Sequence, residues 1–142
     1  MNKVYETLPH TADIKLMVEG ETLEESFEKA AYALIDTAVD IETVEPKEKI
    51  RVVVRGTDIY ELLYNFIEEL IVLIDAESKV FSKFKVTINK KDGAFMLEGE
   101  LWGEHLDLKK HKPKIHVKAA TYHEMEIKKE DSKYILSFVL DI

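Results

Sequence analysis

Two carboxylates end the chain, and their closeness suggests a place that binds a cation. Residues 134–142 alternate as a β-strand does and end on Asp141 and on Ile142, which carries the main-chain carboxylate. Apolar residues occupy both faces of this predicted strand, so we expect both faces to be at least partly covered. Two anionic groups held this close repel each other unless a cation lies between them.

A third carboxylate stands at the start of another predicted strand. Asp13 opens residues 13–19, in which apolar residues alternate with polar ones. If this strand is a neighbour of the terminal strand, then Asp13, Asp141 and the Ile142 carboxylate can converge. Three oxygen donors of this kind suit Ca²⁺, Mg²⁺ or Mn²⁺ rather than zinc. The alternative is that the carboxylates simply face solvent at a sheet edge.

The sequence offers little support for other chemistry. It contains no phosphate-binding glycine loop, no nucleophile elbow, no zinc-binding helix motif and no cysteine. Histidines could supply a zinc site, but none forms an i, i+4 pair on a predicted helix, so hydrogen-bonded or surface roles are favoured. These histidines are His10, His105, His111, His116 and His123.

The charge balance favours a protein or metal partner. The net charge is −8 and 34% of the residues are charged, which disfavours strong direct binding of nucleic acid. Residues 109–114 form the only basic cluster along the chain, and we expect a solvated loop there, although it could dock a phosphate or an acidic partner. Carboxylates on the second predicted helix, Glu68 and Glu69 among them, are expected to form a solvated face.

Composition also indicates the compartment. Without cysteine, a signal peptide or a membrane-spanning run in the sequence, we expect a cytoplasmic protein that does not associate with a membrane. Many Lys and Glu residues with few Gly and Pro are typical of thermophilic proteins.

The elements that must position the carboxylates can be read from the hydrophobic pattern. Thr22 with Glu25 predicts the start of a helix that extends to Ala38, and Asp58 with Glu61 predicts the start of a second, broadly apolar helix. Besides the two strands already named, we predict strands at 49–55, 84–88, 95–101, 114–118 and 125–129, with a turn at 89–93 between the hairpin strands. Residues 1–142 are therefore expected to form one α+β domain, a mostly antiparallel sheet with two helices packed on it.

Four segments together resemble one family, the archeases. They are residues 9–14 (PHTADI), 65–70 (NFIEEL), 117–123 (VKAATYH) and 141–142 (DI), and the resemblance covers essentially the whole chain. It implies a cytoplasmic protein cofactor of the RtcB-type tRNA-splicing ligase, which joins RNAs bearing 2′,3′-cyclic phosphate ends. The cofactor would accelerate guanylylation of the ligase, enable multiple turnover and broaden its nucleotide use beyond GTP.

The resemblance further implies a protein that is not itself an enzyme. A second role in the family is as a chaperone-like modulator of a tRNA cytosine methyltransferase. The rival hypothesis is a stand-alone metal-dependent phosphoesterase that acts on cyclic-phosphate RNA ends with the same carboxylates.

Site residues also follow from the resemblance. It implies a metal site at Asp13, Asp141 and Ile142, with Ca²⁺ as the expected ion. Other residues of the matching segments are expected to support this site, and for the segment at 117–123 a purely structural role as a strand-to-turn connection is the alternative. The supporting residues are His10, Glu69, Lys118, Thr121 and His123.

Overall fold

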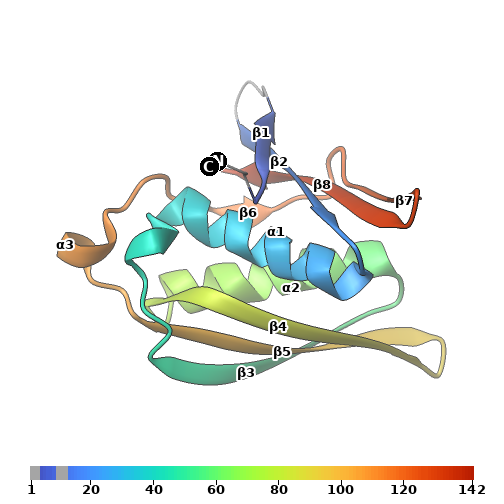
Figure 1. Ribbon diagram of the computed structural model, residues 1–142, viewed down its shortest axis with the longest axis horizontal. Coiled ribbons are helices and arrows are strands. Elements are labelled where there is room, and N and C mark those ends of the chain that lie inside the picture. The colour runs from blue at the N-terminus through green and yellow to red at the C-terminus, as the bar shows by residue number, and fades with distance from the viewer. Residues whose placement is uncertain (1–3, 9–12) are drawn as a thin grey trace.

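Two long helices lie between two antiparallel sheets in the computed structural model, which describes residues 4–8 and 13–142 (Figure 1). The predicted α+β class, with two helices packed on mostly antiparallel strands, is confirmed. The strands divide between two sheets, a separation that the hydrophobic pattern does not reveal, because the pattern does not say which strands pair.

The larger sheet joins strands from the two ends of the chain. Its strand order is β1 (Glu6–Leu8), β2 (Asp13–Gly20), β8 (Lys133–Asp141) and β6 (Ala119–Ala120), and β7 (Glu126–Glu130) pairs with the opposite half of β8. The order in the smaller sheet is β3 (Glu48–Gly56), β5 (Ala94–His105) and β4 (Lys79–Lys91).

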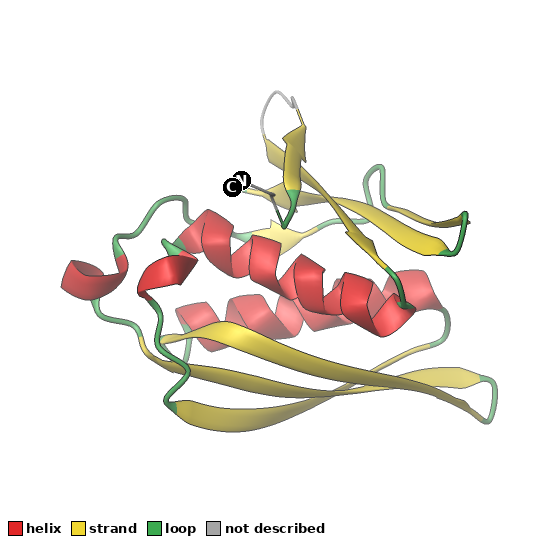
Figure 2. Ribbon diagram, in the orientation of Figure 1, coloured by secondary structure: helices red, strands yellow, loops and turns green. Residues whose placement is uncertain are grey.

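The long helices begin at the predicted caps. The side chain of Thr22 accepts a hydrogen bond of 3.0 Å from the Glu25 N–H at the start of α1 (Leu23–Ala38). Asp58 accepts one of 2.8 Å from the Glu61 N–H at the start of α2 (Ile59–Asp75). A 3₁₀ turn (Ile41–Thr43) and the short helix α3 (Leu108–His111) complete the helices of the described residues and were not predicted (Figure 2).

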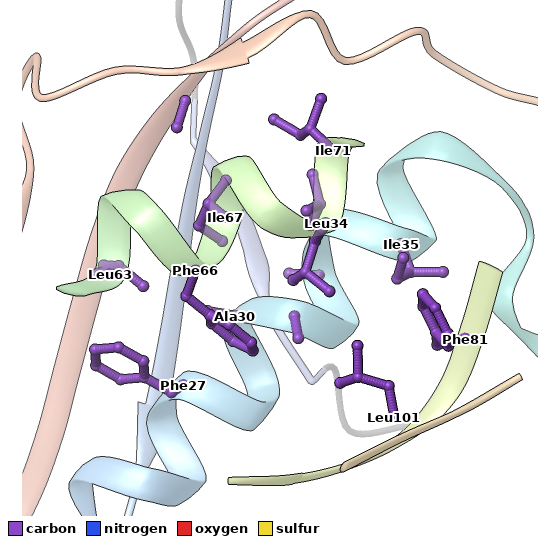
Figure 3. Packing of buried hydrophobic residues seen from close by; sticks show 14 of the residues in the cluster. Phe27, Ala30, Leu34, Ile35, Leu63, Phe66, Ile67, Ile71, Phe81 and Leu101 are labelled. Carbon is purple, nitrogen blue, oxygen red and sulfur yellow. The ribbon is translucent and has the colours of Figure 1, made fainter. Parts of the chain in front are cut away.

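The core fills the space between the helices and continues onto both sheets. Figure 3 shows Phe27 of α1 and Phe66 of α2 side by side, with ring centroids 6.1 Å apart. Phe81 of β4 and Leu101 of β5 extend the cluster into the smaller sheet, and Leu136, Phe138 and Leu140 of β8 are buried on the other side. Because both helices are covered on two sides, α2 needs the wide apolar face seen in its sequence.

The hairpin between β4 and β5 is longer than predicted. Residues 89–91 belong to β4 and pair with residues 94–96 of β5, so the turn at 89–93 shrinks to Asp92 and Gly93. Both turn residues have positive φ, 52° and 77°. A two-residue turn of this kind matches the twist of the flanking strands, and it holds them in register closer to the tip.

The predicted strand at 114–118 is wrong. In the structure, the backbone N–H groups of Lys114 and Ile115 donate to the carbonyls of Ala38 and Thr37 at the end of α1, so they form no ladder with a strand. Pairing begins later, with β6, and the predicted strand at 125–129 is shifted by one residue to β7.

Within the described ranges, no helix combines the length and the apolarity that crossing a bilayer requires.

Candidate functional site

The first strand residue of β2 lies opposite the last strand residue of β8. The two strands pair antiparallel without a register shift from Asp13 opposite Asp141 to Gly20 opposite Tyr134. The condition on which the convergence of Asp13 and Asp141 depended, that the two strands are neighbours, is therefore met. Directly opposed residues place their side chains on the same face with Cβ atoms about 5 Å apart, so the two aspartates form a carboxylate pair.

The carboxylate pair is open to solvent on one side. Asp13 is half-buried, with its Oδ1 atom buried, whereas Asp141 is exposed and Ile142 is 39% exposed. Opposed like charges destabilise a sheet. A partly desolvated carboxylate beside a second one is an arrangement that favours a cation.

Strand β6 fixes the other edge of Asp141. Ala119 pairs with Asp141, and the backbone N–H of Lys118 donates to the Asp141 carbonyl over 2.8 Å. Asp141 is thus held between β2 and β6, and its backbone cannot move without breaking both pairings. The predicted supporting residue Lys118 therefore contacts the backbone of Asp141, one member of the carboxylate pair.

Glu68 of α2 ties β6 to the helix layer. Its Oε1 accepts a hydrogen bond of 2.6 Å from the Ala120 N–H. The sequence predicts Glu69 as a supporting residue and Glu68 as part of a solvated face. In the structure, Glu68 makes the hydrogen bond from α2 to the β6 backbone, and Glu69 is half-buried on the same helix. Sequence reasoning missed Glu68 because adjacent glutamates on one helix look alike until the packing of that helix is known.

The loop after β6 is tied to both strands of the pair. Thr121 Oγ1 donates to the Val139 carbonyl over 3.0 Å and accepts from the His123 N–H over 3.2 Å. His123 Nε2 lies 3.0 Å from one oxygen of Glu124, whose other oxygen lies 3.1 Å from Lys15 Nζ on β2. The geometry therefore brings Thr121 and His123 to the end of the sheet that carries the carboxylate pair.

Two tyrosines that the sequence did not single out stack beside this loop. The rings of Tyr64 on α2 and Tyr122 are 4.3 Å apart and nearly parallel, at 7°. Tyr122 is 52% exposed, and its pKa is raised by partial burial and by the nearby Glu61, Tyr64 and Asp58. The carboxylate end of the sheet is thus bordered by an exposed aromatic surface.

Histidines do not assemble a second site in the described residues. Between residues 13 and 142 and in residues 4–8, no three His, Asp or Glu side chains lie in a group that could hold a metal ion. His10 lies outside the described residues. His111, instead of being a ligand, is buried: its Nε2 lies 2.8 Å from Glu104, and its Nδ1 accepts from the Asp107 N–H.

The predicted cation site stays a prediction, and its donors fit the ion. It contains two side-chain carboxylates, and its third donor is the main-chain carboxylate of Ile142. All three are hard oxygen donors, the kind that Ca²⁺ binds together with water. Asp13 and Asp141 are placed directly opposite each other by the register of β2 and β8.

The basic cluster at 109–114 is partly tied into ion pairs. Lys110 Nζ lies 2.6 Å from Glu45 and 2.9 Å from Glu104, and Lys114 Nζ lies 3.3 Å from Asp36. These carboxylates neutralise two of the four lysines, Lys110 and Lys114, whereas Lys109 and Lys112 are exposed, so the charge seen in the sequence is compensated in part.

Relatives of this chain match it over nearly its full length. The model of the Archease protein family (MTH1598/TM1083) matches residues 5–142. Protein archease of Pyrococcus furiosus is 46% identical over 139 residues, which cover 97% of this chain and 98% of the relative. Protein archease of Sulfurisphaera tokodaii is 46% identical over 138 residues, with coverage of 97% and 98%.

Solved structures share the fold. The solution structure of Methanobacterium thermoautotrophicum protein 1598 superposes with a TM-score of 0.87 at 38% identity, covering 98% of this chain and 99% of that one. The crystal structure of an archease from Thermotoga maritima, described as a possible chaperone, superposes with a TM-score of 0.62 over the whole of both chains; at 15% identity it shows the fold alone. With the family's sequence matched along the chain and its fold reproduced around the paired carboxylates, this chain belongs to the archease family.

Proposed function

We propose that this chain acts in the cytoplasm as an activator of an RtcB-type RNA-splicing ligase and binds Ca²⁺ at Asp13, Asp141 and Ile142. The activator accelerates guanylylation of the ligase, enables multiple turnover and broadens nucleotide use. It does not join RNA itself. The observation that carries the proposal is the register of β2 and β8, which sets Asp13 opposite Asp141 at an exposed sheet end.

The chain's own residues supply a rigid, anionic end that a partner can reach. Strand register sets Asp13 opposite Asp141, and the Ile142 carboxylate adds a third oxygen donor. When bound, Ca²⁺ supplies positive charge that can offset these carboxylates and attract phosphate oxygens. Glu68 and Thr121 keep β6 and its loop against β8, so the edge that carries Asp141 stays in place.

The loop after β6 offers a surface for protein contact near this end. Tyr122 is 52% exposed, and Tyr64 stacks on it. Exposed aromatic side chains are enriched where proteins meet. This surface also fits a chaperone-like role toward a tRNA cytosine methyltransferase, a second function in line with the description of the Thermotoga maritima relative as a possible chaperone.

The test is stimulation of ligase guanylylation. A purified RtcB-type ligase is mixed with labelled GTP and with this chain or its variants Asp13→Ala and Asp141→Ala. We expect either variant to remove most of the stimulation, because each leaves too few oxygen donors to hold the ion. Circular dichroism should show both variants folded.

A matched control removes a carboxylate from the far end of the same strand pair. Glu19, opposite Ile135, lies on β2 with an exposed side chain, so Glu19→Ala should stimulate like the unchanged chain. Full stimulation by both aspartate variants would refute the proposal. Turnover of cyclic-phosphate RNA by this chain alone, with Mn²⁺ or Mg²⁺, would favour the phosphoesterase.

A further inference from the structure

The outer face of the smaller sheet gathers positive charge in an acidic protein. Along β3, β5 and β4, alternate residues point away from the helices, and the described elements leave this face uncovered (Figure 1). The rows of this face from Arg55 opposite Met96 to Lys49 opposite Trp102 carry five cations and two carboxylates, a net charge of +3 in a chain of net charge −8. The cations are Lys49, Arg51, Arg55, Lys83 and Lys85.

Strand register arranges the cations in two lines around a central strand. Lys49 on β3 and Lys83 on β4 both lie opposite Trp102 on β5, and one row further Arg51 and Lys85 both lie opposite Glu100. This convergence is invisible in the sequence, where the residues are scattered over 37 positions from 49 to 85. The only basic cluster along the sequence lies at 109–114, and two of its lysines, Lys110 and Lys114, are held in ion pairs.

Carboxylates neutralise only part of this charge. Lys49 Nζ lies 2.9 Å from Glu100, and Arg51 lies 2.7 Å from Glu98. No carboxylate of the described residues forms an ion pair with the side chains of Arg55, Lys83 or Lys85. These three cations have no close ion pair in the described part of the chain and can meet an external anion; Lys85 is attracted by Glu100 and Glu28 at longer range.

An aromatic ring lies in the middle of the charged rows. Trp102 is half-buried, with Lys83 Nζ 4.6 Å and Lys49 Nζ 5.9 Å from its ring centroid. Lys49, Arg51, Lys85 and the two glutamates line a hollow of about 360 Å³ next to it. An open antiparallel sheet with cations around an aromatic ring is the arrangement by which proteins bind single-stranded nucleic acid, phosphates on the cations and a base on the ring.

We propose that the outer face of the β3–β5–β4 sheet binds a single strand of RNA through its phosphates, with Trp102 beside a base. The choice of RNA rests on the proposed function, since the ligase acts on RNA ends. The affinity is modest, with a dissociation constant on the order of 10⁻⁵ M at physiological salt, as for non-specific binding. Weak binding of this kind agrees with the acidic balance of the whole chain.

Trp102 provides the probe, because it is the chain's single tryptophan. An oligouridine strand of 20 nucleotides is titrated into the purified chain, without ligase, while the Trp102 emission is followed. We expect quenching, and a slope of about −2 for log K against log salt, since three cations contribute about −0.7 each for a single strand. Because no ligase is present, the result does not depend on stimulation of guanylylation. RNA binding can fail while stimulation succeeds, and stimulation can fail while RNA binding succeeds.

Two triple variants distinguish an effect of the basic face from an effect of the net charge of the chain. Arg55→Glu, Lys83→Glu and Lys85→Glu together should weaken binding at least about tenfold and flatten the salt slope. The matched control reverses three exposed lysines of the larger sheet, Lys128→Glu, Lys129→Glu and Lys133→Glu, and should change binding less than about threefold, since its net charge is the same but its site is elsewhere. Replacement of the same three residues by Gln (Arg55→Gln, Lys83→Gln and Lys85→Gln) should also weaken binding, although Gln adds no negative charge that would repel RNA.

Three results would overturn the proposal: unchanged emission at saturating RNA, an equal loss in the control variant, or polyglutamate bound as tightly as RNA. The last would identify the face as a dock for an acidic protein surface.

Discussion

Glu104, near the end of β5, connects three separate parts of the chain through one carboxylate. It is 11% exposed and accepts hydrogen bonds from the Glu45 N–H at 2.9 Å, from Lys110 at 2.9 Å and from buried His111 at 2.8 Å. Burial disfavours its charge, but the hydrogen bonds from Glu45, His111 and Lys110 outweigh burial and lower its pKa to about 2. Ionised Glu104 therefore stabilises the fold.

We predict that Glu104→Gln lowers the free energy of unfolding at pH 7 by about 2 kcal/mol, because hydrogen bonds to a charged acceptor are lost or weakened. Since the pKa of Glu104 is lower in the folded state, its contribution is fully present above about pH 4.5 and is lost as the pH falls toward 2. Urea unfolding at pH 7 and at pH 2.5 measures both effects.

The comparison variant for Glu104 is Glu100→Gln, on the exposed face of the same strand. Its ion pair with Lys49 is solvated, so we expect little change in stability. An equal effect of the two substitutions would mean that the contacts of Glu104 contribute nothing particular to the fold.

Glu68 acts on the site through one backbone group. We predict that Glu68→Ala removes the hydrogen-exchange protection of the Ala120 N–H and weakens Ca²⁺ binding, because β6 loses its tie to α2. Glu69→Ala is the control, and amide exchange followed by NMR is the measurement. An equal loss of protection in Glu69→Ala would show that the hydrogen bond from Glu68 does not specifically hold β6.

At the scale of elements, the β4–β5 pairing depends on a glycine at a bulge. The register of β4 shifts between Phe81 and Lys83, and Gly103 on β5 faces this irregularity. A Cβ atom at Gly103 would meet the Val80 carbonyl oxygen, a backbone atom that cannot move aside without breaking the pairing. Only a residue without a side chain fits there.

We therefore predict that Gly103→Ala destabilises the protein by about 3 kcal/mol or more, as overpacking against backbone does. Gly99→Ala, where the new Cβ would meet the Val52 side chain at 3.0 Å, should cost about 1 kcal/mol because a side chain can adjust. Thermal unfolding of both variants measures the difference. Similar melting temperatures would show that the bulge relaxes freely.

The elements were predictable where local chemistry determines them. The caps at Thr22 and Asp58 and the alternation after Asp13 depend on neighbouring residues, and the structure agrees with them. The segment 114–118 failed because its hydrogen-bond partners belong to the end of α1, which no local pattern encodes. Its strand-like composition was overruled by tertiary contacts.

Of the candidate site, the sequence allowed prediction of the two aspartates at the strand ends, Asp13 and Asp141. Asp141 stood out because the terminal strand sets its side chain beside the main-chain carboxylate, and Asp13 because it opens another strand; their opposition followed once the strands were neighbours. The roles of Glu68 and Tyr64 were not predictable, because each depends on how α2 lies against β6 and its loop. The basic face of the smaller sheet was missed for a similar reason: strand register, not sequence order, brings its cations together.

At the scale of the whole molecule, an ion bound at the end of the sheet should stabilise the entire fold. A ligand that binds only the folded state adds about 2.7 kcal/mol at a concentration of 100 times its dissociation constant. We predict that Ca²⁺ raises the melting temperature of the unchanged chain by several degrees. Asp13→Ala and Asp141→Ala should melt at the same temperature with and without Ca²⁺, as scanning calorimetry can test.

A chain extended by a few residues after Ile142 tests the third donor. The extension converts the main-chain carboxylate to an amide, so the Ca²⁺-dependent gain should shrink while Asp13 and Asp141 remain. An unchanged gain in the extended chain would exclude the Ile142 carboxylate as a ligand.

The pairing of β2 with β8 also determines when the site can form. Asp13 and Asp141 are 128 positions apart in the chain, and contacts across so long a loop carry a large closure entropy. We expect such contacts to form after the local hairpin of β4 and β5 and after the packing of the two long helices. A chain still being synthesised has Asp13 long before Asp141 emerges, so a partner that recognises the carboxylate pair meets only chains whose folding is complete.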